Sequence, residues 1–205
     1  PLYSSAASDV YKRQILYERA ESPLYEIELE LKDNFPYLKV ISKLADILEL
    51  IPLKKVFEEE RPHAVFHAAA YKHVPMLELN PWKAVSNNVI GTRNLVEAAK
   101  EFKVERFVLV STDKAVRPAN VMGATKRLAE LLVQAQNGCG LSDTKFMTVR
   151  FGNVVGSVGS VVPLFKRQIE KGGPVTVTHP EITRYFMTIP EACQLILQAG
   201  SMGDG

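Results

Sequence analysis

Residues 106–138 read RFVLVSTDKAVRPANVMGATKRLAELLVQAQNG, and their pattern indicates the fold class. The apolar run RFVLVS (106–111) predicts a strand, and the apolar spacing over 120–137 predicts a helix that ends at Gly138. A polar turn separates the two. A strand followed by a helix is the unit from which parallel sheets are built, because the crossover must return the chain to the same end of the sheet.

The rest of the chain repeats this alternation. Pro52 and Pro190 suit the first turns of two further helices, and Asn80 is the expected N-cap of a long one. The alternation predicts an α/β fold with a parallel sheet that helices cover on both faces. The expected strands are 15–18, 38–42, 63–70 (buried), 106–111, 145–151 and 174–178, and the expected helices are 22–33, from 52, 81–103, 120–137, 161–173, and 190 to about 200.

The composition excludes several functional classes. The 205-residue chain is 46% hydrophobic and 23% charged with a formal net charge of +2, as in ordinary globular proteins. It has no dense lysine or arginine tract, so neither nucleic acid nor an anionic membrane is an expected partner. No apolar run approaches the roughly 18 residues of a membrane-spanning helix.

The cysteines and histidines suggest no metal site. Cys139 and Cys193 lie far apart, which fits neither a disulfide framework nor a ligand pair and suits the reducing cytosol. The four histidines also lack ligand spacing. They are His63, His67, His73 and His179.

The first fourteen residues, PLYSSAASDVYKRQ, differ from the rest of the chain. They are small and polar and show no sustained period. They resemble translated adapter sequence, so we expect 1–14 to be a non-native leader and exclude it from fold reasoning. The alternative is a native disordered tail.

Three segments are candidates for a small-molecule site. In open parallel sheets, ligands bind outside the carboxyl ends of the strands. The segments that follow expected strands with polar or small residues are AAAYKHVP (68–75), STDK (111–114) and FGNVVGSVGS (151–160). The rule selects them without reference to any family.

Five segments resemble the extended short-chain dehydrogenase/reductases of polysaccharide biosynthesis. The similarity is to the branch of nucleotide-sugar 4,6-dehydratases that act on UDP-N-acetylhexosamines, and it covers about residues 15–205. The segments are HAAAYKHVP (67–75), NNVIGT (87–92), STDKAVRPANVMGATKR (111–127), RFGNVVGSVGSVVPLF (150–165) and HPEITRYFMT (179–188). The resemblance implies a Rossmann-like doubly wound sheet, NAD as cofactor, a UDP-sugar substrate and a homo-oligomer at full length. It implies a cytoplasmic protein, either free or anchored to the inner face of the cell membrane.

The family begins with a strand and a glycine-rich turn, of which this sequence shows no trace before residue 91. The resemblance therefore implies a fragment with an incomplete sheet. We expect a partial NAD-binding domain over 15–150 and a partial nucleotide-sugar-binding region over 151–205. The sheet should form two halves with unpaired edges, and the chain alone should bind dinucleotide weakly.

Met122 occupies an unusual position. The wider superfamily carries a Tyr-x-x-x-Lys pair on one helix, and here Met122 stands four residues before Lys126, in the tyrosine's place. A thioether cannot titrate. The resemblance implies that Lys126 holds the nicotinamide ribose of the cofactor. Met122 has two alternatives: it packs near the sugar or the nicotinamide, or it is a residue of the helix core.

The resemblance moves the proton chemistry to the STDK turn. It makes Thr112 the partner of the sugar C4 oxygen, Asp113 the acid for the C6 hydroxyl and Lys114 the base for the C5 proton. Asp113 then needs a raised pKa and Lys114 a lowered one. Burial produces both shifts, because it disfavours the charged form of either group. Thr112 with water, or Lys114, could take the C4-hydroxyl proton. The alternative for Asp113 and Lys114 is a solvated loop pair.

Further residues are carried over as binding contacts. Glu18 would hold the adenosine ribose and favour NAD over NADP. Asp46 could instead cap a helix, the alanines could reflect tight strand packing, and Arg184 a surface salt bridge. The cofactor set is Glu18, Asp46, Ile47, Ala68, Ala69, Ala70 and Asn88, with Asn88 ordering Lys126 through water, and the substrate set is Lys72, Asn153, Val154 and Arg184.

Gly152, Gly156 and Gly159 mimic a dinucleotide fingerprint, but the spacing is G-x-x-x-G-x-x-G and no acidic strand end follows. We assign this loop to substrate. The leading hypothesis is NAD-dependent 4,6-dehydration of a UDP-N-acetylhexosamine. A nucleotide-sugar epimerase and a non-catalytic nucleotide-binding domain are the alternatives.

Overall fold

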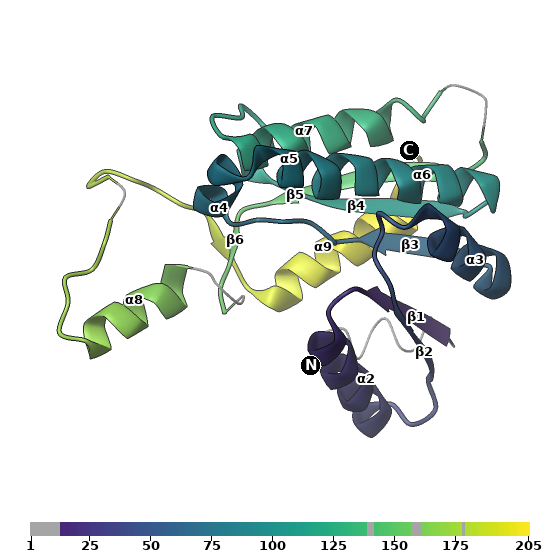
Figure 1. The fold of residues 1–205 in the computed structure, drawn as a ribbon, viewed down its shortest axis with the longest axis horizontal. Coiled ribbons are helices and arrows are strands. Elements are labelled where there is room, and N and C mark those ends of the chain that lie inside the picture. Colours follow the sequence, from purple (N-terminus) through teal and green to yellow (C-terminus); the bar gives the residue numbers. More distant parts are fainter. Residues whose placement is uncertain (1–12, 139–141, 157–160, 178) are drawn as a thin grey trace.

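The computed structural model describes residues 13–138, 142–156, 161–177 and 179–205 (Figure 1). Every described strand pair is parallel, as the alternation predicted. The strands are β1 (Arg13–Glu18), β2 (Lys39–Leu44), β3 (Ala64–His67), β4 (Arg106–Thr112), β5 (Lys145–Phe151), β6 (Asn153–Val154) and β7 (Phe186–Met187). They form three sheets, with strand orders β1-β2, β3-β4-β5 and β6-β7.

Helices follow the strands as expected. Two short turns matter for the site: the π-turn η1 (Ser86–Ile90) and the 3-10 turn η2 (Asp113–Ala115). The α-helices are α2 (Glu21–Asn34), α3 (Leu50–Glu60), α4 (Val74–Leu79), α5 (Pro81–Val85), α6 (Gly91–Glu101), α7 (Val121–Gln134), α8 (Val161–Glu170) and α9 (Ile189–Met202). No helix of the described ranges has the length and apolar character needed to cross a bilayer.

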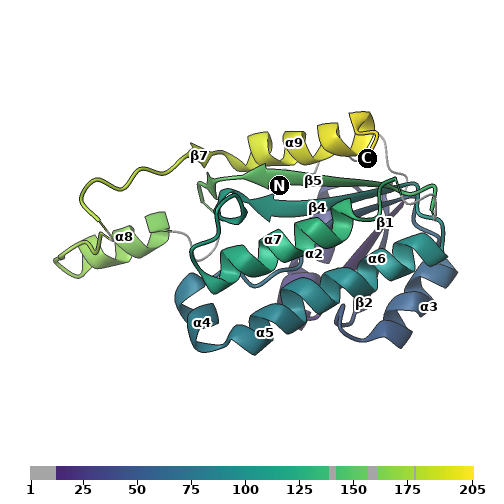
Figure 2. The ribbon, with the colours of Figure 1, turned by 90° about the horizontal axis from the view of Figure 1, so that it is seen from above.

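The sheet β3-β4-β5 forms the middle layer of the molecule. Helix α9 covers one face, and α6 and α7 cover the other (Figure 2). Successive residues of a strand point to opposite faces, so Phe107 and Leu109 pack in the main core cluster while Val108 packs toward α9 with Met147 and Val149. This burial on both faces fixes the position of β4, whose carboxyl end carries the STDK turn.

The sheet is divided as expected. Strands β1 and β2 pair with each other and, with α2, stand beside the three-stranded sheet as a separate unit (Figure 1). Within the described residues β3 pairs with β4 alone. The prediction of a buried strand over 63–70 is wrong in its extent and burial. The strand has four residues, and Phe66 is 38% exposed because β3 lies at an edge of its sheet.

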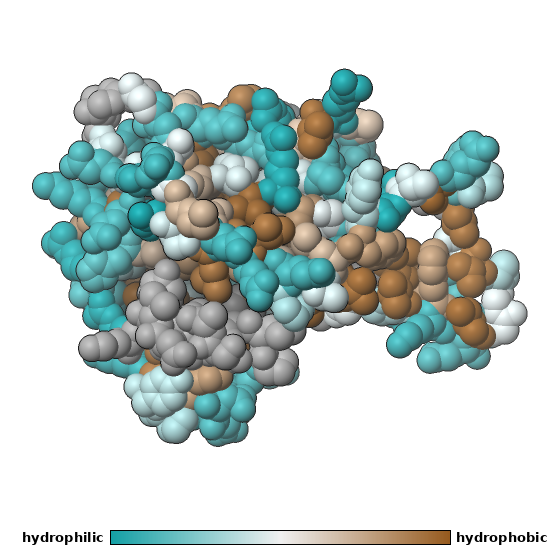
Figure 3. All heavy atoms as spheres, turned by 180° about the vertical axis from the view of Figure 1, so that it is seen from behind, coloured by the Kyte–Doolittle hydropathy of each residue, from teal (hydrophilic) through white to brown (hydrophobic). Residues whose placement is uncertain are grey.

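One other prediction is wrong. Residues 174–177 of the expected strand PVTVT form no strand, and Val177 is 54% exposed; residue 178 lies outside the described part. This segment follows α8, which has no buried residue and extends away from the sheet (Figure 1). The apolar side chains Leu164 and Ile169 of α8 are exposed, and apolar surface is visible on the projecting part of the molecule (Figure 3).

The helix expected over 81–103 is present as the continuous helical run α5, η1 and α6 over 81–101, with a π-turn in its middle. Asn80 takes the expected N-cap position, but its side-chain amide donates to Met76 O of α4 and makes no cap bond to α5.

The domain limits stay predictions. Strand β1 begins at Arg13, so its first two residues fall inside the expected leader 1–14. The boundary at 150/151 falls at the end of β5, where the chain leaves the three-stranded sheet.

Candidate functional site

The STDK turn lies at the carboxyl end of β4 and is closed by its own side chains. Thr112 Oγ1 accepts a hydrogen bond from Lys114 N at 3.4 Å and donates one to Asp113 Oδ1 at 2.9 Å. Lys114 Nζ donates to Asp113 Oδ1 at 3.0 Å and to Asn153 Oδ1 at 3.3 Å. The structure therefore brings together four predicted site residues from two segments of the chain.

The charge of Asp113 differs from the expectation. Burial would raise the pKa of Asp113, but the hydrogen bonds from Lys114 and Thr112 stabilise the carboxylate and hold its pKa below the usual value. The expected raised pKa is therefore wrong, since the sequence did not show that both neighbours donate to the same oxygen. Asp113 and Lys114 form an ion pair, and both side chains are partly exposed, Lys114 by 29% and Asp113 by 36%.

Lys126 lies deeper, on α7, and is only 6% exposed. Its Nζ donates to Val110 O of β4 at 2.7 Å. Burial lowers the pKa of Lys126 to about 8, although the nearby Glu130 carboxylate acts in the opposite direction. On β3, burial and the charge of Lys126 lower the pKa of His67 to about 3. A lysine with this pKa is a donor that remains mostly charged at neutral pH.

Asn88 connects the helix of Lys126 to the loop after β3. It lies in the π-turn η1 and is 1% exposed. Its Oδ1 accepts from Tyr71 N at 2.8 Å, and its Nδ2 donates to Tyr71 O at 3.1 Å and to Thr125 Oγ1 at 3.0 Å. The amide thus bonds the residue next to Lys126 and holds the segment that follows Ala70.

Met122 is part of the core. It is 4% exposed and packs in a cluster with Leu77 and Ala84, against Tyr71 and Val74. Of the two alternatives for Met122, the structure supports a position in the helix core.

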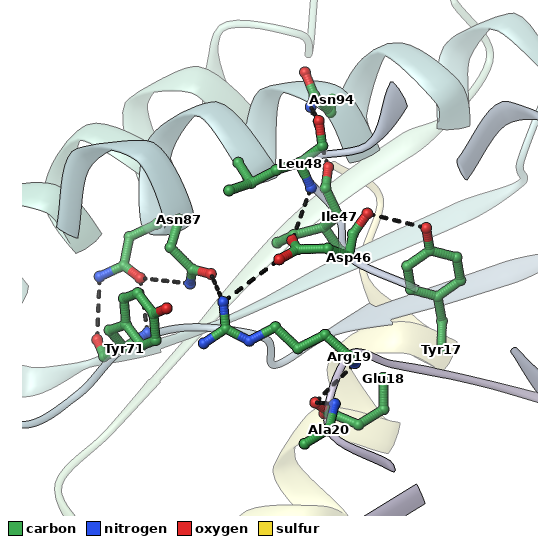
Figure 4. Close-up of polar contacts among 11 residues, drawn as sticks. Tyr17, Glu18, Arg19, Ala20, Asp46, Ile47, Leu48, Tyr71, Asn87 and Asn94 are labelled. Atoms are coloured by element: carbon green, nitrogen blue, oxygen red, sulfur yellow. Dashed lines mark hydrogen bonds and ion pairs between the residues drawn. The ribbon is translucent and has the colours of Figure 1, made fainter. Parts of the chain in front are cut away.

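The predicted cofactor residues at the ends of β1, β2 and β3 line one cavity of about 210 Å³. Figure 4 shows how Glu18, Asp46 and Ile47 lie in this region. Ala68 and Ala69 are exposed, so the alternative of tight strand packing does not apply to them. Ile47 is buried and packs closely against Gly91. A Cβ at position 91 would lie 2.4 Å from Ile47 Cδ1, so the close contact needs a glycine. The lining residues are Tyr17, Glu18, Arg19, Ala45, Asp46, Ile47, Ala68, Ala69, Ala70, Tyr71 and Asn87.

The two carboxylates of the cavity are anchored by backbone amides. Glu18 Oε1 accepts from Arg19 N and Ala20 N, both at 2.9 Å. Asp46 Oδ1 accepts from Leu48 N at 2.9 Å, which closes a local turn; it does not cap α3, whose N-cap is Glu49. A carboxylate offers about four acceptor positions, so both groups keep the capacity to accept ligand hydroxyls.

Sequence reasoning missed Arg19, whose guanidinium spans the cavity. Its Nη1 donates to Asn87 Oδ1 at 3.3 Å and lies 3.5 Å from Asp46 Oδ2, and the group stacks 4.5 Å from the ring centre of Tyr71 (Figure 4). Tyr17 OH also donates to Asp46 O at 3.1 Å. The available signal was position, because Arg19 and Tyr17 adjoin the predicted Glu18 at the end of β1.

The remaining substrate predictions are more scattered. Lys72 and Arg184 are exposed, and Arg184 donates to the carbonyl of the adjacent Thr183 at 3.0 Å. Val154 pairs with Met187 in the β6-β7 ladder. Gly152 is required by close approach, since a Cβ there would lie 2.7 Å from Tyr185 O.

Two expectations concern metals and the glycine loop. In the described ranges, no group of three or more His, Cys, Asp or Glu side chains could hold a metal ion. Gly156 adopts a positive φ of 79°, as a turn between β6 and α8 requires. Gly159 and Cys139 lie outside the described residues.

Comparison with known sequences gives a consistent set of relatives. A family model described as "Polysaccharide biosynthesis protein" matches residues 2–205. The chain is 54% identical over 192 residues to the capsular polysaccharide biosynthesis protein CapD of Staphylococcus aureus, covering 93% of this chain and 32% of that protein. It is 44% identical over 144 residues to a UDP-glucose 4-epimerase of Rickettsia canadensis, covering 68% and 42%. The chain therefore spans about a third of the length of the first relative.

Solved structures share the fold. Pen from Bacillus thuringiensis matches with a TM-score of 0.87 and 37% identity, covering 95% of this chain and 59% of that one. DesIV, a dTDP-glucose 4,6-dehydratase from Streptomyces venezuelae with NAD and DAU bound, matches with a TM-score of 0.77 over 94% and 65%. At 21% identity, DesIV supports the fold alone, which is the predicted Rossmann-like α/β class.

Proposed function

The chain belongs to the polysaccharide biosynthesis protein family, and we propose that it carries the active site of an NAD-dependent 4,6-dehydratase of a UDP-N-acetylhexosamine. The observation that supports this most is the contact of Lys114 Nζ with both Asp113 and Asn153. An acid and a base on one turn, beside a loop suited to a sugar nucleotide, are what an elimination needs. We include a cytoplasmic location and a homo-oligomer in the proposal.

The cavity at the ends of β1, β2 and β3 fits the adenosine half of NAD. Its carboxylates, Glu18 and Asp46, can accept hydroxyl and amino groups, and its three alanines allow close approach. Arg19 adds a flat cation that can stack on a base. Lys126, with its lowered pKa, would hold the nicotinamide ribose. NAD, when bound, supplies a hydride acceptor for the sugar C4 position.

The STDK turn would then carry out the elimination. Thr112 binds the C4 oxygen, Lys114 removes the C5 proton, and Asp113 protonates the C6 hydroxyl, which leaves as water. The C4 ketone makes the C5 proton acidic. This assignment requires a neutral Lys114 and a protonated Asp113, whereas the resting pair is ionic.

The ion pair can become the reactive pair without a change in net charge. One proton moves across the 3.0 Å contact from Lys114 Nζ to Asp113 Oδ1. A sugar that covers the turn excludes water, and exclusion of water disfavours the ion pair relative to the neutral pair. Elimination returns a proton to Lys114 and takes one from Asp113, which restores the ion pair. The hydride taken from C4 would then be returned to C6 while Lys114 gives a proton to C5. The C4-hydroxyl proton, released earlier to water beside Thr112, balances the proton that Lys114 regains from solvent.

An epimerase is the second candidate, because the Rickettsia canadensis relative bears that name. A C4 ketone serves epimerases as well, so product analysis separates the two. The full-length gene product is incubated with NAD and UDP-N-acetylglucosamine, and the products are weighed by mass spectrometry. Loss of one water supports dehydration, whereas an isomer of equal mass supports epimerisation. Intact NAD binding with no turnover would support a non-catalytic module.

A further inference from the structure

A fully buried carboxylate lies behind the STDK turn. Glu130 is on α7, four residues after Lys126, and is 0% exposed. Its Oε1 accepts from Ser111 Oγ at 2.6 Å and Arg150 Nε at 2.7 Å. Its Oε2 accepts from Arg150 Nη2 at 2.5 Å and Arg127 Nη1 at 2.9 Å. A buried charge is stable only with partners of this kind, so the cluster is costly to disturb.

Two partners of Glu130, Ser111 and Arg150, lie near the carboxyl ends of β4 and β5. Ser111 and Arg150 are directly opposite each other in the β4-β5 ladder. Ser111 immediately precedes Thr112, and Arg150 lies three residues before Asn153. The same two chain segments meet again where Lys114 Nζ contacts Asn153 Oδ1. Glu130 therefore joins the two strands just before they diverge into the loops of the proposed site.

We propose that Glu130 is a positioning residue, which holds the ends of β4 and β5 so that Lys114 and Asn153 meet and which keeps a negative charge beside Lys126. The inference rests on the proposed function only for the role of Lys114. Glu130 lies behind the turn and is assigned no contact with the sugar.

The negative charge of Glu130 raises the pKa of Lys126, in opposition to burial. The groups that face Lys126 are Glu130 on its own helix, the carbonyl of Val110 on β4 and His67 on β3. His67 is neutral at ordinary pH, since burial lowers its pKa to about 3. Loss of the Glu130 charge should therefore lower the pKa of Lys126 further below about 8.

Two variants of the full-length protein separate charge from geometry. Glu130→Gln keeps the shape of the side chain but removes the charge. Ser111→Ala removes the bond to β4 and leaves the carboxylate and both arginines in place. Glu97→Gln is the matched control, because Glu97 is a half-exposed glutamate paired with Arg93.

The first readout does not require turnover. In protein labelled with ¹³C at lysine Cε, the Lys126 resonance is assigned with Lys126→Arg and titrated against pH. Glu130→Gln should lower the Lys126 pKa by about one unit or more, whereas Ser111→Ala and Glu97→Gln should leave it unchanged. An unchanged titration in folded Glu130→Gln would overturn the charge role.

The second readout is turnover. Ser111→Ala should reduce kcat about tenfold or more, since small displacements of reacting groups have large effects, with an unchanged KM for NAD. Full turnover of Ser111→Ala would overturn the positioning role, including the case in which Glu130→Gln fails to fold. A wild-type protein that turns over no nucleotide sugar refutes the proposed function, and the Lys126 titration still decides the charge role.

Discussion

Lys114 Nζ lies 3.0 Å from Asp113 Oδ1, and the two residues are adjacent on a turn at the end of β4. At this distance a proton can pass between the groups without movement of the backbone. The proposed mechanism depends on this relationship more than on any other contact.

Lys114→Arg should abolish dehydration as completely as Lys114→Ala. Arginine can pair with Asp113 but does not deprotonate in proteins, so it cannot act as the base. Turnover is measured by product formation, and NAD binding by calorimetry should be unchanged. Lys55→Ala, at a lysine whose side chain is 72% exposed, is the control and should retain wild-type turnover. A clearly active arginine variant would remove Lys114 from the role of base.

The acid limb of kcat/KM should lie below the ordinary range of an aspartate. The free enzyme needs one proton on the Asp113–Lys114 pair, and a second proton binds only when pH falls through the pKa of Asp113. That pKa is lowered by hydrogen bonds from Lys114 and Thr112, which outweigh burial. Activity should therefore persist below pH ~4, the usual aspartate value, and Asp113→Asn should be inactive throughout. An acid limb above pH ~5 would contradict this.

Gly123→Ala should damage the turn despite favouring the helix. An alanine in a helix interior normally stabilises it by about 1 kcal/mol relative to glycine. Here the new Cβ would lie 2.4 Å from Lys114 O, a backbone atom. We expect a loss of about 1–3 kcal/mol in unfolding free energy and a reduced kcat. Urea unfolding and turnover are compared with Ala124→Gly, at the exposed next position. A stabilised, fully active alanine variant would show that the turn does not depend on this contact.

Met122→Tyr should not improve catalysis. Met122 is buried against Leu77 and Ala84, so a tyrosine would overfill the cluster, at a cost of about 1–3 kcal/mol. Met122→Leu has a similar volume and should cost less than about 1.5 kcal/mol with turnover retained. Unfolding and turnover are measured for both variants. A stable, faster Met122→Tyr would mean that this position faces the chemistry.

The sequence predicted most of the fold and the grouping of the site. The boundaries of β5 agree with the prediction, because an apolar run between polar turns marks a strand buried on both faces. The prediction for 174–178 was wrong, since its β-branched residues match a strand but residues 174–177 form no strand, and Thr176 bonds the Gln168 side chain of α8 instead. Pairing depends on what lies beside a segment, and local pattern does not contain that information.

Within the site, position was predictable and charge was not. The family resemblance assigned Glu18 and Asp46 to the cofactor, and they line one cavity together with Ala68, Ala69 and Ala70, which lie in a segment that the carboxyl-end rule had selected. The direction of the Asp113 pKa depends on two donors that converge on one oxygen, which is a matter of side-chain geometry. The role of Glu130 could not be predicted for a similar reason, because two of its three partners, Ser111 and Arg150, are 19 and 20 positions away in the sequence.

In the proposed dehydration, one hydride leaves C4 and returns to C6 of the same sugar. The most direct measurement uses UDP-N-acetylglucosamine with deuterium at C4, the full-length protein and NAD, with the product read by NMR. Dehydration predicts a product that has lost one water and carries the deuterium on its C6 methyl group. Deuterium that remains at C4, in a product of unchanged mass, would refute dehydration and indicate an epimerase.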